Sequence, residues 1–533
     1  MRVIKQSTSI IVWLFVGLMI CLASGCAPHD YKSEADQDVY DLIHAQWQDQ
    51  FGSKANYKIS DTEPLPADIR IDRNIPNLGV LSLPQAVALA TAYNRDYQSQ
   101  RETLYLQGLN LRLSRYEFEN HFFGGLGAGY AADGNDAVLG FEANVGFNRL
   151  LKTGTQMSVR VAEAWANVLT GNLKSGVTSI LGVSVTQPLL RNSNRNMVME
   201  NLTQTQRDTL YQIRAFNRYR KTFVVSVIAE YYRTLLWLEK SQLAKANREA
   251  LIGLHDHAEK LVQAGLLPKL ELNRVHQEVL QAHDRYLQLY QQYEQALDHF
   301  KLTLGISAST PLTLDIQELN SLRQADLKLP AFSEPEVVNS ALLRRLDLAN
   351  VSDRVIDAQR KIIVAKDQLR ADLSLVGRAD VVTSKRADRL SLNSLDNEYG
   401  LGLDLDLPID RMTEATALRR AQIDLLARKR DYEQTTTEIS LAIRDDYRRL
   451  TEATDRHKVQ TEALTLAKKR LNDTTVLLRH NRVNTRRVLQ AIKDLYDAQI
   501  ADGEALVDFS VALLEFYRDT GILNVQPDGM WKL

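Results

Sequence analysis

The sequence predicts a mainly helical fold in which one unit, built of long helical hairpins and β-strands, occurs twice. Three observations support this prediction. Helix-starting and helix-ending signals recur at fixed offsets, long stretches carry helical periodicity, and strictly alternating segments interrupt both copies at equivalent places. The composition agrees, because 7% aromatic residues, 12 Pro and 25 Gly in 533 residues are low counts for a chain folded wholly as a sandwich or barrel.

The charge balance and hydropathy exclude several classes of protein. The 65 Lys and Arg residues against 66 Asp and Glu give a net charge of −1, which argues against a nucleic-acid binder that relies on a basic surface. Hydrophobic content of 44% excludes wholesale disorder. A mean hydropathy of −0.27 excludes a polytopic helical membrane protein, but it leaves open a membrane β-barrel, whose strands are only half apolar.

The N-terminus carries a targeting signal. Arg2 and Lys5 precede an apolar run over 10–23, which is shorter than the roughly 20 residues that span a bilayer. We therefore predict a signal peptide over 1–25. The residues Leu22-Ala23-Ser24-Gly25-Cys26 resemble a bacterial lipobox, which predicts cleavage before Cys26 and lipidation of its thiol.

Lipidation would leave no intrachain disulfide, because Cys21 is removed with the signal and Cys26 is then the remaining cysteine. Ala27, rather than Asp, favours sorting to the outer membrane. An ordinary secretory signal with a free thiol at Cys26 and an uncleaved membrane anchor are the alternatives.

The rest of the chain divides into a tether, two repeats and a tail. The tether covers 26–80, with Pro64, Pro66 and Pro76 and one short helix near Val39–Trp47. The first repeat covers 81–325, the second 326–525, and a short tail 526–533.

Two offsets define the repeat. Pro335 follows Pro84 by 251 positions (335 − 84), and each lies near the first turn of a helix. Asn481 follows Gly265 by 216 positions (481 − 265), and both residue types tolerate the left-handed conformation at a helix C-terminus. The first copy therefore holds 35 extra residues (251 − 216) between its first helix and its turn.

Each copy is predicted to contain one long helix and two shorter helices. The two shorter helices together are nearly as long as the long one. A helix of about 70 residues would reach roughly 100 Å at 1.5 Å per residue. Val275 opens a seam spaced 4, 3, 4, 3 that runs to Phe300 and predicts coiled-coil packing, and 485–520 repeats it less regularly. The predicted helices cover 83–119, 194–263 and 269–305 in the first copy and 335–371, 412–479 and 485–520 in the second.

Alternating segments predict strands over about 122–187 in the first copy and about 373–407 in the second. In 399–407 leucines and a tyrosine alternate with Gly400, Gly402, Asp404 and Asp406. A sheet with one apolar and one polar face can be a soluble half-buried sheet or a membrane barrel, and the strands alone fit both. The 35 extra residues are about one hairpin in size, either outside the barrel or added to its wall.

These features together resemble the TolC-like outer membrane efflux protein family, over about 80–525. The lipobox is similar to that of the lipoprotein branch of the family. The matching motifs are Leu83-Pro84-Gln85-Ala86-Val87, Gln187-Pro188-Leu189-Leu190, Ala264-Gly265-Leu266, Arg345-Leu346-Asp347-Leu348, the strand 399–408 and the turn 482–489.

The resemblance implies a trimer with a long periplasmic α-barrel and a shared outer-membrane β-barrel, to which each protomer gives four strands. It implies a passive exit duct for solutes in a tripartite efflux or type I-like export system. The implied partners are two further copies of the chain, a periplasmic adaptor, an inner-membrane pump reached through it, and outer-membrane lipid, but no nucleic acid. A single copy cannot close a barrel, so its open edges agree with oligomerisation.

The resemblance also implies site residues. Ala264, Gly265, Leu266 and Leu267 match the tip that meets the adaptor, and Asn481, Arg482 and Val483 occupy the second turn. Plain helix caps are the alternative. Arg487 and Gln490, with Arg486 alongside, stand where relatives narrow the tunnel with carboxylates. A ring of Arg487 would attract anions and repel cations; otherwise Arg486 and Arg487 are solvated or paired with Glu271 or Asp494. Asp404 and Asp406 are expected to face the barrel lumen.

No enzyme or cofactor is expected. The sequence lacks a nucleophile elbow, a P-loop, a zinc-protease motif and a dinucleotide fingerprint. His255 and His257 lie two positions apart, which does not place them on one helix face, so no metal site is predicted. The covalent lipid on Cys26 is the only predicted non-protein group. A structural coiled-coil envelope lipoprotein without channel activity remains the alternative function, although it leaves the strands unexplained.

Overall fold

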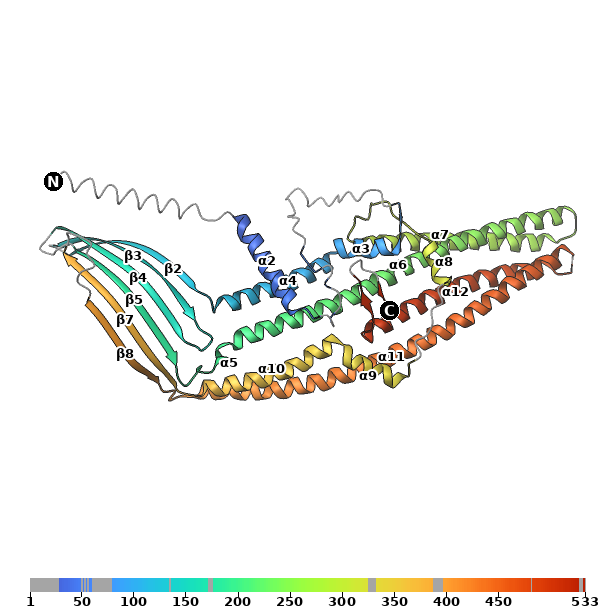
Figure 1. Ribbon diagram of the computed structural model, residues 1–533. Helices are drawn as coiled ribbons and strands as arrows, with labels where there is room; N and C mark the ends of the chain where they lie inside the picture. Colours follow the sequence, from blue (N-terminus) through green and yellow to red (C-terminus); the bar gives the residue numbers. More distant parts are fainter. Residues whose placement is uncertain are drawn as a thin grey trace. The chain divides into compact units, whose positions relative to one another are not determined.

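The structure is a computed structural model, and it describes residues 28–48, 51, 54, 57–59, 79–133, 136–170, 176–324, 332–386, 396–480, 482–526 and 531–532. The signal peptide, Cys26 and Asn481 lie outside the described residues. The chain divides into two compact units, each of which is described separately below. The first comprises 1–47, 105–210 and 363–418, and the second comprises 48–104, 211–362 and 419–533. Figure 1 labels the elements.

A helix occupies most of the described part of the predicted tether. α2 (Pro28–Gln46) starts before the expected 39–47 and is more than twice as long. Within the first unit, Arg112 pairs with Glu34 and Asp38 at 3.1 and 2.9 Å, which joins α2 to the following helical segment. The Cβ that Gly108 lacks would lie 2.6 Å from Val39, so the two helices approach closely there.

The helix predicted over 83–119 is in fact two helices, α3 (Leu83–Tyr93) and α4 (Arg95–Tyr116). The single-helix prediction was wrong because Asn94 is extended, with φ −64° and ψ 130°, and acts as a cap for both helices. Its N–H donates to the Ala90 carbonyl, and its side-chain oxygen accepts from the Tyr97 N–H at 2.9 Å. Asn is among the preferred capping residues because its side chain satisfies an orphan helix N–H.

The second repeat breaks at the equivalent residue. α9 (Glu334–Arg344) and α10 (Leu346–Gln368) meet at Arg345, which is 251 positions after Asn94, the offset that relates the two prolines. Both first helices start with a capping box, Ser82 with Gln85 and Ser333 with Glu336. The repeat is therefore present in backbone geometry as well as in sequence.

The long helices lie close to their predicted bounds. α6 (Glu200–Gln263) follows the single turn α5 (Arg195–Val198), and α7 (Lys269–Leu304) returns from it. α11 (Met412–Arg479) and α12 (Thr485–Asp519) form the second hairpin. No helix among the described residues is both long enough and apolar enough to cross a membrane.

The heptad seams form the core of the second unit. Val275, Ala282 and Phe300 of α7 are buried, as are Leu506, Leu513 and Phe516 of α12. An apolar cluster packs α12 against α9, α10 and α11 through Phe509, Phe516, Val337, Leu348 and Ile443, among others. The predicted core role of these residues is confirmed.

One antiparallel sheet of six strands dominates the first unit, in the order β2-β3-β4-β5-β7-β8 (Figure 1). The first repeat supplies four strands, β2 (His121–Asp133), β3 (Asp136–Leu150), β4 (Gln156–Thr170) and β5 (Gly176–Pro188). The second supplies β7 (Asp372–Arg386) and β8 (Asp396–Asp406). The predicted strand regions of both repeats are confirmed, and the sheet exceeds the family's four strands per protomer because the extra residues of the first repeat form a hairpin within it.

Strand register gives the sheet two chemically distinct faces. Directly opposed residues share a face, so the pairs Phe122–Phe147, Val145–Val161 and Leu375–Leu403 lie on one side. The other side carries mainly glycine, small polar and charged residues, among them Asn144, Arg160, Gly182, Asp380 and Asp404. The alternation predicted from the sequence is confirmed.

Short elements complete the fold. β1 (Val80–Leu81) pairs in parallel with β6 (Thr313–Leu314), and α8 (Gln317–Gln324) follows β6. Near the C-terminus, β9 (Asn524–Val525) and β10 (Trp531–Lys532) form a small antiparallel ladder. The predicted tail 526–533 therefore contains one strand.

Candidate functional site

The first candidate site is the turn between α6 and α7, where the backbone reverses within five residues. Gly265 has φ +72°, a conformation that favours glycine. Its N–H donates to the Val262 carbonyl at 3.0 Å, and the Leu266 N–H donates to the Leu261 carbonyl at 2.8 Å. This pair of bonds is the Schellman motif, in which a glycine in the left-handed conformation ends a helix. The prediction that Gly265 terminates a helix is confirmed.

The second turn joins α11 to α12. The Arg482 N–H donates to the Leu477 carbonyl at 2.9 Å, and Asn484 caps α12 by accepting from the Arg487 N–H at 3.2 Å through its side-chain oxygen. Asn481, which was predicted to contact the adaptor, lies outside the described residues. The sequence analysis missed Asn484, although an Asn followed by Thr485 and a helical pattern is a usual N-cap signal.

The two turns pack against each other within the second unit. Leu267 from the first and Val483 from the second join one apolar cluster with Leu254, Val275 and Val488. Leu266 instead is 73% exposed, and Leu270 is 70% exposed. The predicted contact residues therefore divide into two sets. Ala264, Gly265, Leu266 and Arg482 are exposed, whereas Leu267 and Val483 hold the turns together.

The second turn presents a basic surface. Arg479, Arg482, Arg486 and Arg487 are all exposed there. The sequence analysis offered Glu271 and Asp494 as partners for Arg486 and Arg487, but Glu271 pairs with Arg274 at 3.0 Å. Asp494 instead binds Arg470 and accepts from the Gln490 side chain at 2.7 Å. Among the described residues neither Arg486 nor Arg487 forms an ion pair.

The second candidate site is the polar face of the sheet. Asp404 lies opposite Ser374, and Asp406 lies opposite Asp372, with Leu403 and Leu405 on the reverse side. Asp380 sits directly over Gly182 on this face, and Glu142 over Gly127, because a Cβ on either glycine would come within 2.7 Å of the carboxylate. The polar face thus carries both acidic groups and the guanidinium groups of Arg160 and Arg378.

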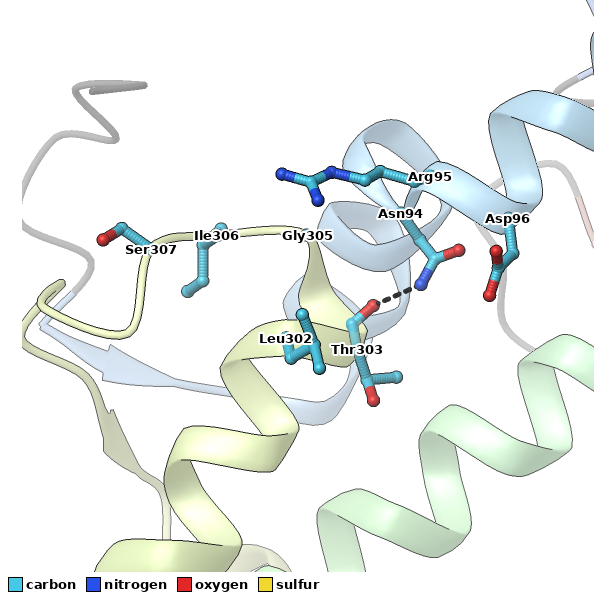
Figure 2. Close-up of a pocket in the computed structure, with 8 residues that line it drawn as sticks. All are labelled: Asn94, Arg95, Asp96, Leu302, Thr303, Gly305, Ile306 and Ser307. Atoms are coloured by element: carbon cyan, nitrogen blue, oxygen red, sulfur yellow. Dashed lines mark hydrogen bonds between the residues drawn. The ribbon is translucent and has the colours of Figure 1, made fainter. Parts of the chain in front are cut away.

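A pocket of about 500 Å³ lies where α7 ends beside the break between α3 and α4. Figure 2 shows the Asn94 side chain reaching the Thr303 carbonyl, to which it donates at 2.9 Å. Gly305 ends α7 with φ +75°, and a Cβ there would lie 2.2 Å from the Tyr93 carbonyl oxygen. This pocket accompanies a close helix contact and gathers no set of groups suited to chemistry.

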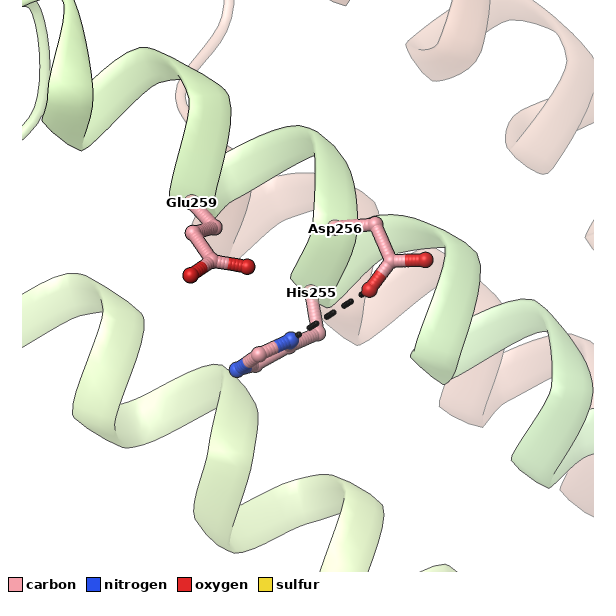
Figure 3. A group of neighbouring side chains, drawn as sticks. All are labelled: His255, Asp256 and Glu259. Carbon is pink, nitrogen blue, oxygen red and sulfur yellow. Dashed lines mark ion pairs between the residues drawn. The ribbon is translucent and has the colours of Figure 1, made fainter.

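Figure 3 shows a further side-chain group on α6, formed by His255, Asp256 and Glu259. The His255 ring contacts the Asp256 carboxylate at 3.6 Å and lies 5.3 Å from the His276 ring of α7. Asp256 and Glu259 are exposed. Exposed carboxylates beside a histidine are ordinary on a solvated helix, so the prediction of no metal site stays a prediction.

Solved structures with this arrangement are known. CusC, described in connection with transmembrane channel formation, matches with a TM-score of 0.61 at 16% identity, over 82% of this chain and 92% of its own. The CmeC outer membrane channel of Campylobacter jejuni matches with a TM-score of 0.57 at 13% identity, over 89% of this chain and 91% of its own.

The open-state MtrE outer membrane channel of Neisseria gonorrhoeae matches with a TM-score of 0.59 at 13% identity, over 82% of this chain and 88% of its own. The chain has the fold of the TolC-like outer membrane channels. No protein-family model matches the sequence. No curated protein matches it either.

The matched proteins are channels, and the expectation that this chain is not an enzyme agrees with them. The mainly helical class predicted from the sequence is confirmed. The site residues at the turns and on the sheet are not tested by these matches and stay predictions.

Proposed function

We propose that this protein is the outer-membrane exit duct of a tripartite efflux or type I-like export system. Three copies share a β-barrel in the outer membrane and form a helical tunnel in the periplasm. The observation that carries this proposal is the sheet in the first unit. Its apolar face is exposed, with Phe122, Tyr399 and Leu401 each more than three-quarters accessible. A sheet in water would bury such an apolar face against other parts of the protein, whereas in a membrane the same face lies against lipid.

The sheet also needs partners of its own kind. Among the described residues no strand pairs with the outer edge of β2 or of β8. Unpaired N–H and C=O groups cannot remain in the hydrocarbon core, so a membrane sheet must close. Further copies of the same chain supply the missing edges.

The turns are the proposed docking surface for a periplasmic adaptor. Leu266 and Leu270 are large apolar side chains that no other group of the second unit covers, while Leu267 and Val483 hold the two turns in one rigid tip. Exposed apolar side chains on a rigid support are the usual form of a protein-binding site. The proposed docking surface also includes Ala264, Asn481 and Arg482.

Arg486 and Arg487, with Gln490, form the proposed constriction at the tunnel mouth. Both guanidinium groups lack an acidic partner among the described residues, so their charge is available to passing solutes. A cationic ring would favour anions over cations. Asp404 and Asp406 keep the barrel lumen wet, and a lipid on Cys26 anchors the chain to the periplasmic leaflet.

Cell fractionation and drug susceptibility test the proposal together. The full chain should appear in outer-membrane fractions as a heat-modifiable trimer, and its deletion should raise susceptibility to dyes, detergents or metals. Labelled palmitate should enter the wild type and not Cys26→Ala. A purely structural envelope lipoprotein would instead yield a soluble species with an α-only circular-dichroism spectrum after removal of its lipid, and that result would reject the duct.

A further inference from the structure

We propose that all six strands of the sheet belong to the barrel wall and that β8 of one copy pairs with β2 of the next. Three copies of six strands then close a barrel of 18 strands (3 × 6). This inference rests on the proposed function, and it concerns the interface between copies and the width of the duct.

The first support is that the additional hairpin keeps the alternation of apolar and polar residues in step with that of β4. β4 begins at Gln156, 35 positions after β2 begins at His121 (156 − 121), which equals the excess length of the first repeat. A shift by 35 places Val161 on Leu126 and Trp165 on Tyr130, and all four residues lie on the apolar face. Strand β2 of the inserted hairpin therefore places its apolar residues on the same face as β4, the strand that follows the hairpin in the chain.

The second support is that the apolar face continues from β4 across the inserted hairpin, with Glu163 as a charged residue on that face. Phe122 of β2 contacts Phe147 of β3 with ring centroids 6.0 Å apart, and Phe141 of β3 contacts Trp165 of β4 at 5.5 Å. Phe122 is 77% exposed and Tyr130 is 65% exposed. A hairpin held outside the membrane would leave this aromatic surface in water, whereas a hairpin in the wall places it against lipid.

The third support is the direction of the two edges. Every neighbouring pair in the sheet is antiparallel, so in a sheet of six strands β2 and β8 run in opposite directions. An edge of β8 can therefore continue onto β2 of another copy as one more antiparallel pair. A sheet with an odd number of strands could not do so.

The strand ends fix the register of this new pair. β2 begins at His121 just after α4 ends at Tyr116, and β8 ends at Asp406 just before α11 begins at Met412. Placing both junctions at one membrane boundary sets His121 opposite Asp406 of the next copy. Leu126 then faces Leu401, and both lie on the apolar face.

The consequence is a wide lumen. With strands about 4.8 Å apart and tilted by about 40°, 18 strands enclose a backbone diameter of about 36 Å, against about 24 Å for 12 strands. Barrels of 16 to 18 strands hold an aqueous channel, so this wall leaves room for bulky polar solutes.

Paired cysteines test the interface in the full-length protein, in its own membrane. Leu126→Cys with Leu401→Cys should cross-link copies under copper phenanthroline, giving covalent dimers and trimers on a denaturing gel. Val161→Cys with Leu401→Cys is the matched control. If hairpin β2–β3 lay outside the wall, β4 would take the place of β2 at the interface, and Val161 would then face Leu401 of the next copy. Leu126→Cys with Gly400→Cys is the control for opposite faces. Neither control pair should cross-link.

The outcomes separate this inference from the proposed function. Cross-linking of Val161 with Leu401, in variants that still confer resistance, would leave the duct intact and overturn the 18-stranded wall. Absence of any cross-link in resistant variants would overturn it as well. If the variants fail to assemble, electron microscopy of the unmodified trimer decides, since the barrel should measure about 36 Å across its backbone and not about 24 Å.

Discussion

The Asn94 side chain donates a hydrogen bond to the Thr303 carbonyl at 2.9 Å and thereby ties the break between α3 and α4 to the end of α7. Two residues further on, Gly305 lies against the Tyr93 carbonyl. The second repeat has the same contact, because Gly521, 216 positions later, has φ +77° and packs on Arg344. In this contact the two glycines are related by the offset of 216, and the residues they pack on, Tyr93 and Arg344, by the offset of 251.

We predict that Gly305→Ala destabilises the protein by about 2–4 kcal/mol, because it adds an αL strain and a Cβ only 2.2 Å from a backbone oxygen. Gly265→Ala is the matched control, since Gly265 has a similar φ but no atom within 4 Å of its missing Cβ. It should lose only about 1 kcal/mol. Thermal unfolding of the two variants measures the difference, and equal losses would contradict the close-contact explanation.

Leu266→Ala should impair efflux without lowering stability, because the Leu266 side chain contacts solvent and not the core. Leu267→Ala should lower the melting temperature instead, with a loss of about 1–2 kcal/mol, because its side chain packs in the cluster that joins the two turns. Drug susceptibility and thermal unfolding, measured on both variants, distinguish a role in adaptor binding from a role in packing the two turns together. A fully active Leu266→Ala variant would argue against this residue as an adaptor contact.

Replacing Arg487 by Ala should raise channel conductance or antibiotic leakage, since the variant removes a cationic ring from the proposed constriction. Arg487→Lys should retain the wild-type behaviour because it keeps the charge. Arg448→Ala provides a control for a general loss of surface charge, since Arg448 is exposed on α11 at a distance along the chain from the turn. Planar bilayer recordings measure the effect, and unchanged conductance in Arg487→Ala would remove the gate hypothesis.

Burial raises the pKa of Asp446 to about 6, with the nearby Asp519 adding to the shift. The unfolded chain has an Asp pKa near 3.9, so between about pH 4 and pH 6 the native state binds more protons. Stability from this group is therefore present below the unfolded pKa and declines as the pH rises through about 6. Asp446→Asn should flatten this decline and gain about 1–2 kcal/mol at pH 7.5. Denaturation at pH 5 and pH 7.5 measures it, and an unchanged pH slope would contradict the assignment.

Deleting residues 121–155 should give an assembled, narrower barrel, because the 35-residue shift keeps the apolar residues of β4 on the lipid side. Deleting 121–133, which removes β2 alone, should abolish assembly, since a sheet with an odd number of strands leaves two edges that cannot pair antiparallel with each other. Heat-modifiable trimers on gels report both results. Equal behaviour of the two deletions would show that the number of strands does not control closure of the barrel.

Much of the fold was predictable because its signals are local and periodic. The seam of α7 and the alternation of β8 repeat over enough residues to identify a helix and a strand, and the bounds of α11 were predicted to the residue. The break at Asn94 was missed, because the helical pattern continues across it and its side chain contacts Thr303, more than 200 positions away. Local propensity contains no information about that contact.

The candidate site was predicted in part for the same reason. Gly265 was identified as a turn from residue type alone, since few residues accept its φ. The different roles of Leu266 and Leu267 were not predictable, because they depend on Val483 and Val488 of the other hairpin.

The sequence by itself determined the duplicated helical hairpins, the two-faced strands and the 35 extra residues, because each is written in residue spacing. Only the tertiary structure decided that those extra residues join one sheet between α4 and β4. Strand neighbours are chosen by backbone hydrogen bonds between distant segments, and side-chain periodicity is the same whether a hairpin stands alone or lies in a wall.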